Sequence, residues 1–142
     1  MSDPKHLVID GAWDLLGTPF RMQGRADSGV DCAGVIHQAY LAGGIDLAHE
    51  NRYAWHSDYS RLMDELLDRY FVQIPSPESC CVVTFYVKTR GKARHMGILV
   101  PVAGGFDLIH ASQGTKKVVR ETFGASWKRR VVAYWGLKEW QQ

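Results

Sequence analysis

The amino-acid sequence predicts one α+β domain built on an antiparallel sheet. Helical patterns fill the first half of the chain, strand patterns fill the second half, and the two kinds hardly alternate. The 142 residues are enough for one domain with a substantial core, and neither an internal repeat nor a linker divides them. We therefore expect residues 1–142 to form a single domain.

Three helices are expected where apolar residues recur at helical spacing. Asp3 and Pro4 make a capped start for the first helix, and Gly17 ends it. The third helix is amphipathic, with an apolar stripe opposite a row of charged side chains. The expected segments are residues 4–16, residues 32–42 and residues 59–71.

Four strands are expected in the second half, where β-branched and aromatic residues become frequent after Pro75 and Pro77. Gly104 and Gly105 separate the second expected strand from the third, which predicts a hairpin. The expected strands are residues 81–87, 95–100, 106–111 and 130–135.

Cys32 follows a glycine-rich, polar approach and opens the second expected helix. The first turn of a helix offers unpaired N–H groups and the positive end of the helix dipole, and both favour a thiolate over a thiol. Asp31, or Ser28 a little earlier, can cap this helix. Position alone leaves two interpretations open, a nucleophile or a small buried residue.

Two histidines complete the set that a cysteine nucleophile requires. His95 opens one expected strand and His110 lies in the next, so the hairpin would bring both rings onto neighbouring strands. We assign Cys32 as the nucleophile, His95 as the base and His110 as the group that orients the base. Cys80 and Cys81 are poorer candidates, because the strand that they introduce looks buried and supplies no helix dipole.

Composition excludes several classes of function. The net charge of +2 and the pI near 8.5 are too mild for nucleic acid as the main partner. Three cysteines without a C-x-x-C pair argue against a disulfide framework and a structural zinc site, and we expect no metal or cofactor. The chain shows no signal peptide and no apolar run of spanning length, so we expect no membrane insertion.

Four motifs resemble, in the same order, those of the NlpC/P60 cysteine peptidases. They are Gly17-Thr18-Pro19-Phe20-Arg21 (G-T-P-Y-R in the family), Asp31-Cys32-Ala33-Gly34-Val35 (D-C-S-G-hydrophobic), His95-Met96-Gly97-Ile98 (H-V-G-I) and Ile109-His110-Ala111-Ser112 (I-H-A-S). The resemblance runs from about residue 7 to residue 135. It implies a papain-like fold whose nucleophile helix packs on the antiparallel sheet, with Cys32, His95 and His110 as catalytic residues.

The same resemblance implies hydrolysis of the peptide stems of bacterial peptidoglycan, typically next to D-glutamate and a diamino acid. Substrate contacts are expected from Phe20, Arg21, Gln23, Asp31 and Ser112. Several segments look closest to a short, phage-associated branch of the family; they are residues 21–23, 70–75 and 118–129. The expected partners are therefore stem peptides and phage tail proteins, and the expected location is a virion tail, or the cytoplasm until delivery.

Three departures from the family pattern accompany this resemblance. Phe20 stands where the family usually has tyrosine, and Ser79-Cys80-Cys81 replaces a P-G-D turn. The spacing of the two histidines suggests a longer hairpin tip at residues 102–107. Two alternatives stay open: a non-catalytic tail component, and an acyltransferase or thioesterase that uses the same triad. Whether a loop over residues 45–57 gates the cleft is also open.

Overall fold

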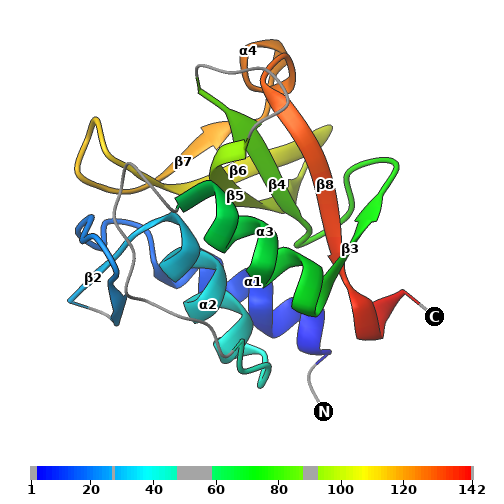
Figure 1. Ribbon diagram of the computed structural model, residues 1–142, viewed down its shortest axis with the longest axis horizontal. Coiled ribbons are helices and arrows are strands. Elements are labelled where there is room, and N and C mark those ends of the chain that lie inside the picture. The colour runs from blue at the N-terminus through cyan, green and yellow to red at the C-terminus, as the bar shows by residue number, and fades with distance from the viewer. Residues whose placement is uncertain (1–2, 27, 48–58, 88–92, 142) are drawn as a thin grey trace.

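A computed structural model of the chain describes residues 3–26, 28–47, 59–87 and 93–141. Helices α1 (Pro4–Asp14), α2 (Cys32–Ala42) and α3 (Tyr59–Tyr70) cover one face of a six-stranded sheet, as Figure 1 shows. The sheet order is β3-β8-β4-β5-β6-β7, and every neighbouring pair is antiparallel. The predicted α+β class is confirmed.

The strands of this sheet are β3 (Phe71–Ile74), β4 (Val82–Tyr86), β5 (Ala93–Val102), β6 (Gly105–Ser112), β7 (Lys117–Thr122) and β8 (Val131–Leu137). A separate two-stranded ribbon, β1 (Arg25–Ala26) and β2 (Gly29–Val30), precedes α2. The short helix α4 (Ala125–Lys128) joins β7 to β8, and the 3₁₀ turn η1 (Lys138–Trp140) follows β8.

Both faces of the sheet are buried in its centre. Ile98 and Ile109 pack with the helices in the larger hydrophobic cluster. Their neighbours Leu99 and Leu108 point to the other face, into a smaller cluster with Phe85 that Trp127 of α4 covers. A strand that is buried on both faces has a continuous run of apolar residues in its sequence, and such runs are found in the second half of this chain.

The predicted helix starts agree with the structure. The carboxylate of Asp3 accepts the N–H of Lys5, and the carboxylate of Asp31 accepts the N–H of Gly34. The first helix ends at residue 14 rather than at residue 16. Phe71 is not the last residue of α3 but the first of β3, because it pairs with Leu137 of the last strand.

The hairpin between β5 and β6 is tight, so the expected longer tip at residues 102–107 is wrong. Val102 pairs with Gly105, which leaves Ala103 and Gly104 as the turn. Gly104 has a φ of 84°, a conformation that glycine adopts at little cost. The residues between the two histidines therefore lie almost entirely in β5 and β6.

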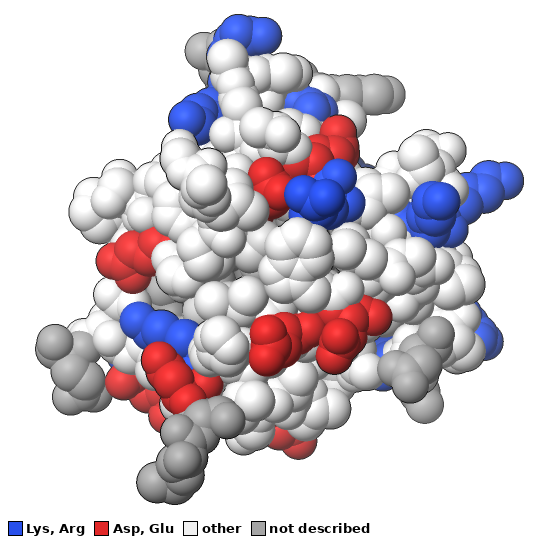
Figure 2. Space-filling model, turned by 180° about the vertical axis from the view of Figure 1, so that it is seen from behind, with Lys and Arg blue, Asp and Glu red and all other residues white. Residues whose placement is uncertain are grey.

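No helix among the described residues is both long and apolar enough to cross a membrane. On the face drawn in Figure 2, Lys and Arg side chains are interspersed with Asp and Glu and form no continuous basic surface. That distribution agrees with the small net charge of +2.

Candidate active site

Cys32 is the first residue of α2, and its side chain is buried. The helix packs against β5 and β6, the two strands that carry the histidines. A cysteine at this position lies beside the N–H groups of the first turn and the positive end of the helix dipole. The structure places Cys32 at the helix start that the sequence predicts, and the reactivity of its thiol stays a prediction.

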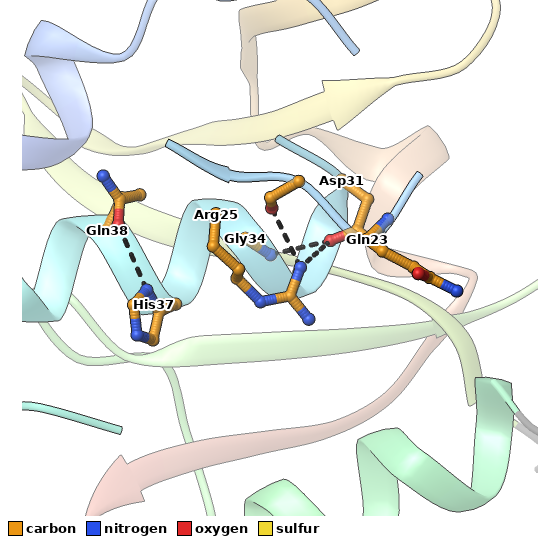
Figure 3. Close-up of polar contacts among 7 residues, drawn as sticks. Gln23, Arg25, Asp31, Gly34, His37 and Gln38 are labelled. Atoms are coloured by element: carbon orange, nitrogen blue, oxygen red, sulfur yellow. Dashed lines mark hydrogen bonds and ion pairs between the residues drawn. The ribbon is translucent and has the colours of Figure 1, made fainter. Parts of the chain in front are cut away.

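Asp31 holds the loop before α2 in place, as Figure 3 shows. Its Oδ1 accepts the N–H of Gly34 at 2.9 Å and Nη1 of Arg25 at 2.8 Å, and its Oδ2 accepts the N–H of Gln23 at 2.9 Å. Burial raises the pKa of Asp31 above its ordinary value, although Arg25 and the N–H groups act in the opposite direction. We expected Asp31 to contact substrate; its burial and these bonds favour a structural role.

Gly34 permits the close approach between this loop and the helix. A Cβ built at Gly34 would lie 2.2 Å from the carbonyl oxygen of Gly24 and 3.0 Å from the Cβ of Val30. Any larger residue at this position of the D-C-A-G motif would therefore collide with the backbone of the preceding loop.

The start of α2 is attached to the end of the sheet at which His110 lies. Phe20 bridges Val30, two residues before Cys32, and donates its N–H to the carbonyl oxygen of Lys116 at 2.8 Å. Lys116 directly precedes β7, whose first residue pairs with the last residue of β6. The first turn of α2 and the end of β6 therefore lie at the same end of the sheet.

His95 of β5 and His110 of β6 form a hydrogen-bonded pair, with Nε2 of His95 2.8 Å from Nδ1 of His110. The pairing of Ile98 with Ile109 sets this register and places the two histidines as diagonal neighbours. Gly97 lies between them, and a Cβ there would be 3.1 Å from the Cβ of His110. The structure thus brings together the two rings whose register the sequence left undetermined.

Glu121 of β7 extends this pair. Its Oε2 is 2.6 Å from Nε2 of His110, and β6 and β7 pair so that Glu121 is the diagonal neighbour of His110 on the same face. Sequence reasoning missed Glu121. The one sequence feature that could have indicated Glu121 is the alternation of side chains along a strand. A strand over residues 117–122 antiparallel to β6 would direct Val119 and Glu121 to the same face as His110.

Trp127 covers the histidine pair. Its ring centroid lies 5.0 Å from that of His110 and 6.3 Å from that of His95, and the ring of Phe85 lies 6.1 Å from His95. The guanidinium of Arg130 lies over the Trp127 ring at 4.2 Å. The pair is therefore shielded by aromatic rings, a cover that sequence reasoning missed.

The surroundings keep both rings neutral at neutral pH. Burial, followed by His110 and Arg130, lowers the pKa of His95 to about 3. Burial also lowers the pKa of His110, and the hydrogen bond and charge of Glu121 offset only part of that effect. A neutral imidazole keeps a lone pair on one ring nitrogen, which is the form that can accept a proton.

Residues 17–136 match the family model named NlpC/P60 family. The chain belongs to the NlpC/P60 family. This is a family of peptidoglycan hydrolases that also includes non-catalytic members. The matched segment contains all four motifs and both histidines.

Solved NlpC/P60 structures share the fold. A lipoprotein-like protein of this family from Staphylococcus aureus has a TM-score of 0.66 and 17% identity over 95% of this chain, which spans 42% of that protein. The NlpC/p60 domain of the peptidoglycan hydrolase SagA has a TM-score of 0.61 and 18% identity, covering 92% of this chain and 96% of that one. RipD of Mycobacterium tuberculosis, described as a non-catalytic domain adapted to peptidoglycan binding, has a TM-score of 0.61 and 14% identity, covering 95% and 97%. No curated protein matches the chain.

The turn that departs from the NlpC/P60 pattern has a left-handed residue. Cys80, in the segment Ser79-Cys80-Cys81, has a φ of 55°. The O–H of Tyr40 donates to the carbonyl oxygen of Cys80 at 2.6 Å and fixes the turn. Burial raises the pKa of Cys80 to about 12 and that of Cys81 to about 11, which agrees with their low ranking as nucleophiles.

The remaining expected substrate contacts of this NlpC/P60 chain lie near the start of α2 and the end of β6. Phe20 and Gln23 are partly buried, and Arg21 is exposed. Ser112 is partly buried and accepts the N–H of Thr115 at 3.2 Å. Their role in binding stays a prediction. Most of the loop over residues 45–57, including Tyr53 and Trp55, lies outside the described residues.

In the part of the chain that the structure describes, no group of three or more His, Cys, Asp or Glu side chains is placed to hold a metal ion.

We expect the stability of the fold to fall as the pH falls from about 6.5 towards 3. His95 has a folded-state pKa of about 3, whereas in the unfolded chain it takes up a proton near pH 6.5. The unfolded state therefore binds more protons in this window, and the free energy of unfolding should be about 2–3 kcal/mol lower at pH 4.5 than at pH 7 from this residue. Denaturant titrations at several pH values measure it.

The His95→Gln variant is the control for this pH dependence, because it removes the titrating ring and keeps the carboxyl groups. Its free energy of unfolding should change less between pH 7 and pH 4.5. Equal slopes for the two proteins would show that His95 is not held neutral.

Proposed function

We propose that this protein is a cysteine endopeptidase that cleaves peptide stems of bacterial peptidoglycan at the bond between D-glutamate and a diamino acid. The observation that carries the proposal is the hydrogen-bonded pair His95–His110, in a chain whose Cys32 opens a capped helix at the same end of the sheet. Membership of the NlpC/P60 family supports the substrate class.

The chemistry has two halves. His95 takes the proton of the Cys32 thiol, the sulfur attacks the carbonyl carbon, and N–H groups at the start of α2 stabilise the oxyanion. His95 then gives its proton to the leaving amine, and an acyl-enzyme thioester remains. In the second half His95 takes a proton from water, the hydroxide attacks the thioester, and the stem carboxylic acid and the thiol are released.

Substrate recognition is proposed for the segment between α1 and α2, which forms bridges to Lys117 of β7 and to Val30 of β2. Arg21 is exposed there, and a guanidinium can pair with a carboxylate of a stem peptide in a bidentate manner. Phe20 and Gln23 flank it, and Ser112 lies at the end of β6.

Mass spectrometry of purified muropeptides tests the reaction. Incubation with the protein should produce two fragments per cleaved stem, one with a new amine terminus and one with a new carboxylate. The His95→Gln variant should produce neither. Muropeptides that stay intact with the unaltered protein contradict the peptidase.

The non-catalytic alternative is favoured by two observations. The fold resembles that of RipD, a protein described as non-catalytic, and Phe20 lacks the hydroxyl of the family's usual tyrosine. In this case insoluble peptidoglycan would retain the protein while no fragments are released. Acyl transfer is distinguished by the same mass spectra, since a new amide would replace the free carboxylate.

Delivery by a phage-type tail is part of our proposal. It is supported by the resemblance of residues 21–23, 70–75 and 118–129 to short, phage-associated members of the family. Immunodetection should then find the protein in purified particles. Its absence from particles, together with a dedicated host export route, would contradict this delivery.

A further inference from the structure

Three polar side chains on three adjacent strands form one continuous relay. Nε2 of His95 lies 2.8 Å from Nδ1 of His110, and Nε2 of His110 lies 2.6 Å from Oε2 of Glu121. The strands β5, β6 and β7 follow one another in the sheet, and each link joins diagonal neighbours on the same face. The sheet register itself therefore fixes the relay.

The hydrogen positions in this relay follow from its far end. A carboxylate has no proton to donate, so Nε2 of His110 must carry the hydrogen that Glu121 accepts. A neutral His110 then has its lone pair on Nδ1, which must accept from Nε2 of His95. His95 in turn keeps its lone pair on Nδ1. The hydrogen position on each group therefore determines the tautomer of the next ring.

We propose that Glu121 is a positioning residue that sets the tautomers of His110 and His95, so that Nδ1 of His95 is the nitrogen that accepts the proton of Cys32. The proposal rests on the proposed cysteine chemistry. With the opposite tautomers, Nδ1 of His95 would carry a hydrogen and could accept nothing.

The same chain of hydrogen bonds also stabilises the protonated form of His95. When one proton moves from the sulfur of Cys32 to Nδ1 of His95, the ring carries a positive charge and still donates Nε2–H to His110. The carboxylate of Glu121 polarises His110 and stabilises that charge through it. Glu121 therefore acts on the base without touching the reacting atoms.

Other groups around the pair do not duplicate this role. Trp127 and Phe85 cover the histidine rings with uncharged aromatic rings. The charge of Arg130 lowers the pKa of both histidines. Glu121 raises the pKa of His110. Its side chain is 45% exposed, so its replacement should leave the core packed.

The test uses Glu121→Ala, which removes the acceptor, and Glu121→Gln, whose carbonyl oxygen can still accept from His110. Thr122→Ala is the matched control, because Thr122 is the next, exposed residue of β7 and its side chain is directed to the opposite face. Imidazole ¹⁵N chemical shifts report the tautomer of each ring. The values of kcat and KM on a cleaved muropeptide report catalysis, each measured from pH 5 to pH 9.

The unaltered protein and Thr122→Ala should show both histidines with hydrogen on Nε2. Glu121→Ala should populate the other tautomer and lower kcat by about 10-fold with KM little changed. Glu121→Gln should keep the tautomers and lose less than about 5-fold in kcat, since only the charge is removed. This rescue by the conservative variant is not expected of a merely structural contact.

Unchanged tautomers in Glu121→Ala, or a loss confined to KM, would overturn the proposal. The ¹⁵N measurement needs no substrate, so it separates this proposal from the proposed function. If muropeptides stay intact while Glu121→Ala changes the tautomers, the relay is supported and the peptidase is contradicted.

Discussion

Replacing Cys32 with alanine is expected to lower kcat/KM on muropeptides by at least about 10⁴-fold, because no other group can form the thioester. Alanine is small and apolar, and the site at the start of α2 is buried in the main hydrophobic cluster. The fold should therefore persist, with a stability change of about 1 kcal/mol. Time courses of fragment release followed by mass spectrometry measure the effect.

The matched control is Cys81→Ala, which removes another buried thiol. Its pKa is raised to about 11 by burial, so it takes no part in the chemistry, and cleavage should continue at nearly the normal rate. If Cys32→Ala still cleaves muropeptides and Cys81→Ala does not, the nucleophile is Cys81, and the assignment of Cys32 is contradicted. Retained binding of Cys32→Ala to peptidoglycan would show that recognition is intact.

Asp31→Ala is expected to have the largest effect on stability, about 3–5 kcal/mol. The substitution removes the cap of α2, which is worth about 1 kcal/mol. It also leaves the guanidinium of Arg25, whose side chain is 13% exposed, without its carboxylate, and breaking a buried ion pair on one side is costly. Chemical denaturation at pH 7 measures the free energy of unfolding.

A double-mutant cycle is the control for this effect. In an Arg25→Met background no charge is left without a partner, so the further change Asp31→Ala should cost about 1–3 kcal/mol less than it does in the unaltered chain. Additive costs would mean that the ion pair does not couple the loop to the helix. A total cost below about 1 kcal/mol would contradict the structural role of Asp31.

The features that sequence predicted correctly depend on neighbours along the chain. Asp3 and Asp31 each cap a helix that begins at the next residue, and Gly104 makes a turn between two adjacent strands. Such signals need no knowledge of distant segments. The pair His95–His110 became predictable for the same reason, because one hairpin joins its two members.

The features that sequence missed depend on distant partners. β7 is mostly exposed, and only its pairing with β6 places Glu121 beside His110. Trp127 lies on a helix of four residues, too short for a periodic signal, and its place over the histidines depends on the turn between β7 and β8. Helical spacing predicts a helix up to Phe71, and the strand pairing that overrides it involves Leu137, 66 positions later in the chain.

The position of β8 in the sheet has a consequence for the order in which the fold is completed during synthesis. This strand is made last, yet it is inserted between β3 and β4 and pairs with both. A nascent chain that already exposes Cys32 still has an open sheet, and the aromatic cover carried by α4 is not yet held in place. The sheet therefore stays divided between β3 and β4 until β8 pairs with both strands, and the surroundings of the histidine pair are complete only at that stage.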